Sequence, residues 1–109
     1  MQLLLCALVL TGSAALAGDA KLDAGSVTVL LTGRTLTYDD GSRQVFKADG
    51  DTVYDNGRPS TGRWTVQGDR YCSVWPPSDH WACYDVTQGD AGIGFVAEDG
   101  SVTLGQLMP

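Results

Sequence analysis

The residues best suited to chemistry gather between positions 62 and 85, in the sequence GRWTVQGDRYCSVWPPSDHWACYD. This stretch contains every tryptophan and the only histidine of the chain. Ser78, Asp79 and His80 carry the hydroxyl, carboxylate and imidazole groups that nucleophilic catalysis uses. Adjacency in a short loop does not make three side chains converge on one point, so an exposed loop histidine is the simpler interpretation. We therefore assign no catalytic residue and expect a protein that is not an enzyme.

Aspartates are frequent enough to raise the question of a metal site, at Asp39, Asp40, Asp49, Asp51 and Asp55. Residues 49–51 nevertheless lack the third ligand, the glycine placing and the distal Glu of a calcium loop. A zinc site needs about four ligands, mostly Cys and His, and this chain offers one histidine. No phosphate-binding glycine motif joins a strand to a helix. Turn formation explains the aspartates, so we expect no metal and no cofactor.

Aromatic side chains around a proline loop are the strongest candidates for binding. Trp75 and Trp81 flank the loop Pro76-Pro77-Ser78-Asp79-His80. Rings held beside a stiff loop would present a preorganised surface to a partner. The alternative is that both tryptophans fill the core or stack on a disulfide, and the sequence leaves this choice open. The candidate surface consists of Tyr71, Trp75, Pro76, Pro77, His80, Trp81 and Tyr84.

The first residues have the character of a signal peptide rather than of a folded element. Residues 1–17 carry no acidic or basic side chain, contain an apolar run at 3–10, and end in Ala15-Leu16-Ala17, a small-x-small cleavage site. The apolar run is too short to span a bilayer. We expect a signal peptide at 1–17, a single domain at 18–109 with no membrane span, and a periplasmic or secreted location.

Removal of this segment would also remove Cys6 and leave Cys72 and Cys83. In an oxidising compartment, an even pair of cysteines in a small domain is most simply a disulfide. Ten residues separate the two cysteines, which suits facing positions on a hairpin. The sequence therefore predicts a Cys72–Cys83 bond that joins two neighbouring strands.

The chain is acidic, with a formal net charge of −6. Binding to nucleic acid requires clustered Lys and Arg, so we expect no nucleic-acid partner. Like charges on the surface favour solubility and weak self-association, so we expect a monomer.

Turn signals divide most of the chain into short strands. Asp-Gly and Asn-Gly steps recur between residues 39 and 100, and such steps accept the positive φ of hairpin turns. We expect a mainly-β fold, an antiparallel meander closed as a barrel or stacked as a sandwich. Residues 25–32 have strand propensity but lie between helix-capping residues, so we expect one short N-terminal helix there. The predicted strands are 35–38, 43–47, 52–54, 62–67, 70–75, 81–87, 93–97 and 102–104.

Three segments carry a resemblance to known proteins: Gly62-Arg63-Trp64, Gly68-Asp69-Arg70-Tyr71-Cys72 and Cys83-Tyr84. With these, the chain resembles a family of small exported bacterial β-domains of unknown function. Lipocalin-like and protease-inhibitor barrels share the Gly-x-Trp strand and the disulfide by analogy. The resemblance implies a small disulfide-bonded β-domain and brings no catalytic or ligand residue with it.

The functional expectation that follows is an exported binding module that uses the face around Trp75 and Trp81. Its partner would be an envelope protein, such as a hydrolase or protease that it inhibits, or a small apolar ligand inside the barrel. The alternative is a structural or stress-related envelope protein without a specific ligand.

Overall fold

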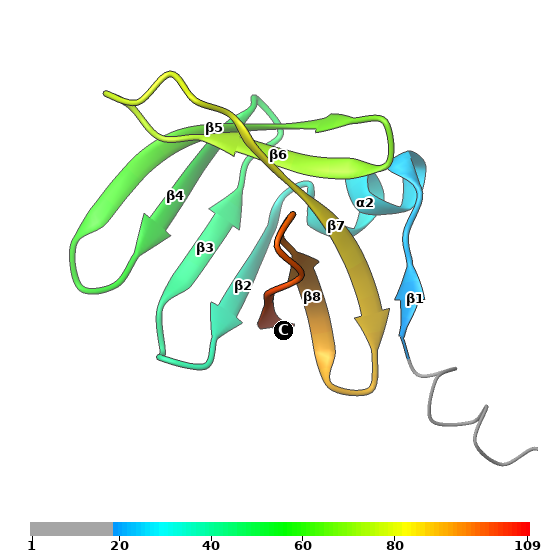
Figure 1. The fold of residues 1–109 in the computed structure, drawn as a ribbon. Coiled ribbons are helices and arrows are strands. Elements are labelled where there is room, and N and C mark those ends of the chain that lie inside the picture. The colour runs from blue at the N-terminus through cyan, green and yellow to red at the C-terminus, as the bar shows by residue number, and fades with distance from the viewer. Residues whose placement is uncertain (1–18) are drawn as a thin grey trace, which may run out of the picture.

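The computed structural model describes residues 19–109, and the predicted signal peptide lies outside these residues. The described chain forms a closed antiparallel barrel with one helix and one short additional strand (Figure 1). The barrel strands are β2 (Arg34–Tyr38), β3 (Arg43–Phe46), β4 (Asp51–Asp55), β5 (Pro59–Gln67), β6 (Arg70–Val74), β7 (Ala82–Gly89), β8 (Gly92–Val96) and β9 (Val102–Leu107). The predicted mainly-β fold is confirmed, and the choice between barrel and sandwich is decided in favour of the barrel.

Consecutive strands from β2 to β9 pair as antiparallel neighbours, which confirms the predicted meander. The barrel closes between its first and last strands, where Leu36 lies opposite Leu107 and Tyr38 lies opposite Gly105. The short strand β1 (Ala20–Lys21) adds to β7 beyond the point where β6 ends its pairing. Closure removes the open sheet edges that a sandwich would leave.

Strand β5 begins at Pro59, three residues earlier than its predicted start at Gly62. The Asn56-Gly57 turn is tight enough for pairing with β4 to continue to the last opposed residues, Asp55 and Pro59. Proline is tolerated at this position because the first residue of a strand need not donate to the ladder.

The helix α2 (Ala24–Leu31) forms where the capping residues predicted it, against the β propensity of its valines. Asp23 is the N-cap and accepts a hydrogen bond from the backbone N–H of Ser26 at 2.9 Å. After the helix, Gly33 adopts a φ of 76°, which glycine reaches without steric cost. Val27 and Leu31 are fully buried, whereas Val29 is 80% exposed. One face of the helix therefore belongs to the barrel core.

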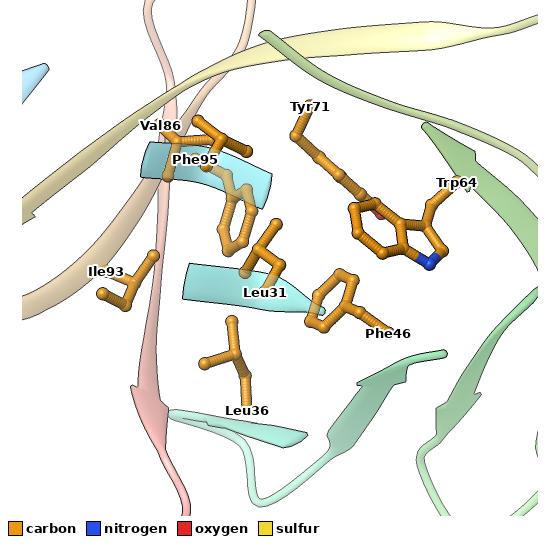
Figure 2. Packing of buried hydrophobic residues seen from close by; sticks show 9 residues of the cluster. Leu31, Leu36, Phe46, Trp64, Tyr71, Val86, Ile93 and Phe95 are labelled. Carbon is orange, nitrogen blue, oxygen red and sulfur yellow. The ribbon is translucent and has the colours of Figure 1, made fainter. Parts of the chain in front are cut away.

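The core fills the half of the barrel that α2 closes. Figure 2 shows Leu31 of the helix surrounded by Leu36, Phe46 and Phe95 from three strands. Phe46 also meets Trp64 edge to face, with ring centroids 5.7 Å apart. Trp64 itself is 8% exposed and donates its indole N–H to the carbonyl of Lys47 at 2.9 Å. The Gly-x-Trp tryptophan is thus a core residue with a satisfied polar group.

The predicted disulfide is confirmed. Cys72 on β6 and Cys83 on β7 are directly opposed in the ladder, with their Cα atoms 4.0 Å apart. The next opposed pair is Tyr71 and Tyr84. The bond therefore fixes the register of the two strands that carry the predicted aromatic residues. Within residues 19–109, the structure contains no helix with the length and apolar character needed to cross a bilayer.

Candidate functional site

A cavity of about 480 Å³ opens at the end of the barrel opposite α2. Its walls come from the end of β2, the start of β3, the end of β4, the end of β6 and the start of β7, with β8 and β9 beside them. We call it the mouth cavity, and it is lined by Tyr38, Asp39, Asp40, Ser42, Gln44, Tyr54, Tyr71, Ser73, Trp75, Tyr84, Phe95, Val102, Thr103 and Leu104.

Six of the residues that line this cavity are aromatic. Tyr38 and Tyr54 lie with ring centroids 6.3 Å apart, and Tyr54 meets Trp75 edge to face at 6.4 Å. On the opposite pair of strands, Tyr71 and Tyr84 stack at 6.0 Å. All four tyrosines of the chain therefore line one cavity. The alternation of side chains along antiparallel strands brings them together, since residues two apart share a face.

Trp75 depends on a glycine in the neighbouring strand. A Cβ atom at Gly62 would lie 2.7 Å from Cε3 of the Trp75 ring and 2.6 Å from the carbonyl oxygen of Val74. Only a residue without a side chain lets the indole approach β5 this closely. The indole N–H of Trp75 donates to Oγ of Ser73 at 3.2 Å. The glycine of the Gly-x-Trp pattern thus positions a ring of the mouth cavity, while its tryptophan belongs to the core.

A hydrogen-bonded group of side chains forms the floor of the mouth cavity. Gln44 is 6% exposed and accepts from the Tyr38 hydroxyl at 2.6 Å. Its amide nitrogen donates to Oγ1 of Thr52 at 2.9 Å and to the Tyr71 hydroxyl at 3.0 Å. Thr52 in turn donates to the carbonyl of Val45 at 2.7 Å. The buried amide therefore has partners for its oxygen and for its nitrogen, which offsets the cost of removing it from water.

Burial also raises the pKa of two tyrosines of this network. Burial is the main cause that raises the pKa of Tyr38 well above its usual range, and nearby tyrosines add to it. Burial likewise raises the pKa of the Tyr71 hydroxyl, against the opposing effect of hydrogen bonds with Ser73 and Gln44. An ionised phenolate in this wall would lack the hydration that stabilises its charge. The floor of the cavity is thus polar but uncharged at neutral pH.

Two carboxylates stand at the rim, on the turn between β2 and β3. Asp39 and Asp40 are both exposed and both line the mouth cavity. Asp40 accepts from the backbone N–H of Ser42 at 2.9 Å and from its hydroxyl at 2.5 Å. The hydrogen bond from the Ser42 hydroxyl is the largest cause that holds the pKa of Asp40 below its usual value. The rim therefore carries negative charge at neutral pH.

The structure divides the predicted binding residues among three places. Tyr71, Trp75 and Tyr84 lie together in the mouth cavity. Trp81 is 44% exposed and lines a separate hollow of about 650 Å³, together with residues of α2 and β5. The loop residues of the predicted surface are exposed, and they are Pro76, Pro77 and His80. Whether any of them binds a partner stays a prediction.

Sequence reasoning missed Tyr38, Gln44, Tyr54 and Phe95 as cavity residues. A signal for two of them was present, because Tyr38-Asp39-Asp40-Gly41 recurs as Tyr54-Asp55-Asn56-Gly57. Tyr38 is the last residue of β2 and Tyr54 the last but one of β4, which places both rings at the same end of an up-and-down barrel. Turn formation alone also explains the repeat, and the sequence does not show that the strands close into a barrel.

The structure also shows the surroundings of the residues considered above for catalysis and metal binding. His80 is exposed, and its backbone N–H donates to Oγ of Ser78 at 3.1 Å. In the part of the chain that the structure describes, no cluster of three or more His, Cys, Asp or Glu residues could hold a metal ion.

No protein-family model matches this chain, and the comparisons with curated proteins and with solved structures give no match. The barrel and its disulfide agree with the fold that the resemblance to small exported β-domains implies, but membership of that family is not shown.

Proposed function

We propose that this protein is an exported binding module that holds a small ligand in the mouth cavity. The observation that carries the proposal is the cavity itself, with about 480 Å³ of space and six aromatic residues among those that line it. Ligand sites typically enclose about 300–1,000 Å³, are lined mainly by apolar and aromatic side chains, and often occupy the mouth of a β-barrel. Export follows from the predicted signal peptide and agrees with the disulfide, since such bonds persist in oxidising compartments.

The construction of the barrel supports binding because it holds the cavity walls rigid. The Cys72–Cys83 bond lies next to the stacked Tyr71 and Tyr84 in the same ladder. On the closed side, α2 occupies the end of the barrel and fills it with Leu31. A preformed cavity loses little conformational entropy when a ligand enters, which favours affinity.

The polar groups of the cavity support binding rather than a chemical step. Gln44 holds the hydroxyls of Tyr38 and Tyr71 in place, and Ser73 accepts from Trp75. These hydrogen bonds fix the directions of the rings. A ligand would therefore meet fixed ring surfaces and a few oriented hydroxyls, which is the arrangement that gives selectivity by shape.

A matched pair of tryptophan variants tests the proposal. Trp75→Ala removes a wall of the mouth cavity, and Trp81→Ala removes a ring of similar size outside it. Ligand-detected NMR on a small-molecule extract of the native compartment should reveal compounds that bind the unmodified protein. Trp75→Ala should weaken their binding by at least about tenfold, whereas Trp81→Ala should leave it unchanged.

Folding must be checked in parallel by circular dichroism, since loss of structure would also abolish binding. The variant Gly62→Ala provides a second measurement, because its Cβ atom presses on the Trp75 ring and on the Val74 carbonyl oxygen without removing the ring, and its folding is checked in the same way. Equal effects of the two tryptophan variants, or binding that survives Trp75→Ala in a folded protein, would refute the mouth cavity as the site.

Contact with a protein partner is a second candidate function, and the exposed Trp81 is the observation that favours it. Trp81 follows the exposed residues Pro76, Pro77 and His80 and is 44% exposed. Tryptophans that become buried in a complex often dominate its affinity. An inhibitor of an envelope hydrolase or protease would use such a loop. In this case the Trp81→Ala variant should no longer inhibit a target protease, whereas the Trp75→Ala variant should still inhibit it. Binding of a small ligand in the mouth cavity predicts the opposite, since it requires Trp75 and not Trp81.

A further inference from the structure

We infer that the ligand of the mouth cavity is a small organic cation of the quaternary ammonium class. It is held by the ring faces of Tyr38, Tyr54, Trp75 and Tyr84. The carboxylates of Asp39 and Asp40 lie above it at the rim. This inference rests on the proposed function and adds the chemical class of the ligand to it. It follows from three features of the cavity: its rings, its charge and the state of its hydrogen-bonding groups.

The rings provide the first argument. Tyr38, Tyr54 and Trp75 form a chain of neighbours with centroids 6.3 and 6.4 Å apart. The stacked Tyr71 and Tyr84 form the other side of the cavity. The face of an aromatic ring carries partial negative charge, and a cation within about 6 Å of the centroid is attracted to it. Several electron-rich rings around one space form the cage by which proteins recognise quaternary ammonium groups.

The charge of the cavity provides the second argument. Of the described residues that line it, the charged ones are Asp39 and Asp40, and no Lys, Arg or His is among them. Arg43 lines a neighbouring hollow, which shares Asp40 and Ser42 with the mouth cavity and also contains Asp55. The protein as a whole has a net charge of −6. A negative potential at the rim attracts cations and repels anions.

The hydrogen bonds provide the third argument, because they distinguish a quaternary ammonium from a primary amine. The floor acceptor, the amide oxygen of Gln44, already receives the Tyr38 hydroxyl, and Oγ of Ser73 receives the Trp75 indole. A primary ammonium on the floor would bring three N–H donors that need acceptors when they leave water, and the carboxylates that could accept them, those of Asp39 and Asp40, lie at the rim. A quaternary ammonium has no N–H group and needs only ring faces and nearby negative charge.

The experiment compares a cation with an uncharged molecule of the same shape. Choline and tetramethylammonium are titrated into the purified protein by isothermal calorimetry. Dimethylbutanol, in which a tert-butyl group replaces the trimethylammonium group of choline, is titrated in parallel. We expect choline to bind at least about tenfold more tightly than dimethylbutanol, and to weaken as salt is added, because both cation–π attraction and the rim charge act only on the cation.

Charge variants provide the matched control. Asp39→Asn removes a rim carboxylate and should weaken choline binding by about threefold while leaving dimethylbutanol unchanged. Asp90→Asn makes the same change in the exposed turn after β7, away from the mouth cavity, and should alter neither.

Three results would overturn the inference, and the first two separate it from the proposed function. If dimethylbutanol binds as tightly as choline and both are lost in Trp75→Ala, the cavity is a binding site without preference for cations. If neither cation binds while the extract still yields ligands that require Trp75, the proposed function stands and the cation class is wrong. If no ligand of any kind requires Trp75, both fail together.

Discussion

The valines of α2 offer a direct test of whether the helix closes the barrel. Val27 and Val29 lie on the same helix, two residues apart, and their side chains are 0% and 80% exposed. The substitutions Val27→Ala and Val29→Ala are chemically identical. They differ in what surrounds the lost atoms, which is the core cluster for Val27 and solvent for Val29.

The expected change in stability follows from how deeply each valine is buried. Truncation of a valine to alanine removes the equivalent of about two methylene groups, each worth about 0.8 kcal/mol when buried. The cavity left behind adds to this, so the core loses about 2–3 kcal/mol at Val27. Alanine is the better helix former by about 0.6 kcal/mol, and this gain applies at both positions. We expect Val27→Ala to destabilise the protein by about 2 kcal/mol and Val29→Ala to stabilise it by about 0.5 kcal/mol.

Urea denaturation of the disulfide-bonded protein measures both variants, with the slope of the transition checked for a change in the unfolded state. A thermal scan should show a fall in Tm of about 10 °C for Val27→Ala, as expected for a domain of this size. If the two variants differ by less than about 0.5 kcal/mol, the buried face of α2 does not contribute to the core, and the helix does not close this end of the barrel.

Two further predictions concern the disulfide and the response to acid. Replacing both Cys72 and Cys83 with serine should reduce the free energy of unfolding by about 3 kcal/mol, because the bond closes a short loop in the unfolded chain. Urea denaturation without reductant measures this loss. An unchanged midpoint would contradict the prediction. Hydrogen bonds from nearby serines lower the pKa values of Asp23, Asp40 and Asp99. Their contribution to stability is complete above the ordinary pKa of 3.8 and is lost as the pH falls through the lower folded-state values. The urea concentration at the midpoint of unfolding should therefore decrease when the pH is lowered below 3.8. A midpoint that does not change with pH in this range would refute the contribution of these hydrogen bonds to stability.

Much of the barrel could be predicted from local chemistry. Glycines after Asp or Asn mark the turns, and each such turn joins two strands that the structure pairs. Cys72 and Cys83 could be paired because their spacing matches a hairpin. The helix was the harder case, because Val27 and Val29 favour a strand. The Asp23 cap and the apolar contacts of Val27 and Leu31 outweigh that preference.

The candidate site could be predicted only in part. Tyr71, Trp75 and Tyr84 were identified because they lie close together in the sequence around the disulfide. Trp81 was grouped with them on the same ground, yet it lines a different hollow. Nearness in the sequence places residues on adjacent strands but does not decide which side of the sheet each ring occupies once the strands twist and close.

The sequence alone determined the short strands, their turns and the disulfide, because each depends on residues within a few positions of one another. Closure of β2 onto β9 was decided by the tertiary structure, since it joins Leu36 and Leu107 from distant parts of the chain. The mouth cavity depends on that closure. Tyr38 and Tyr54 face Tyr71 and Tyr84 only in a closed barrel, because contacts across its interior link strands that no local pattern connects.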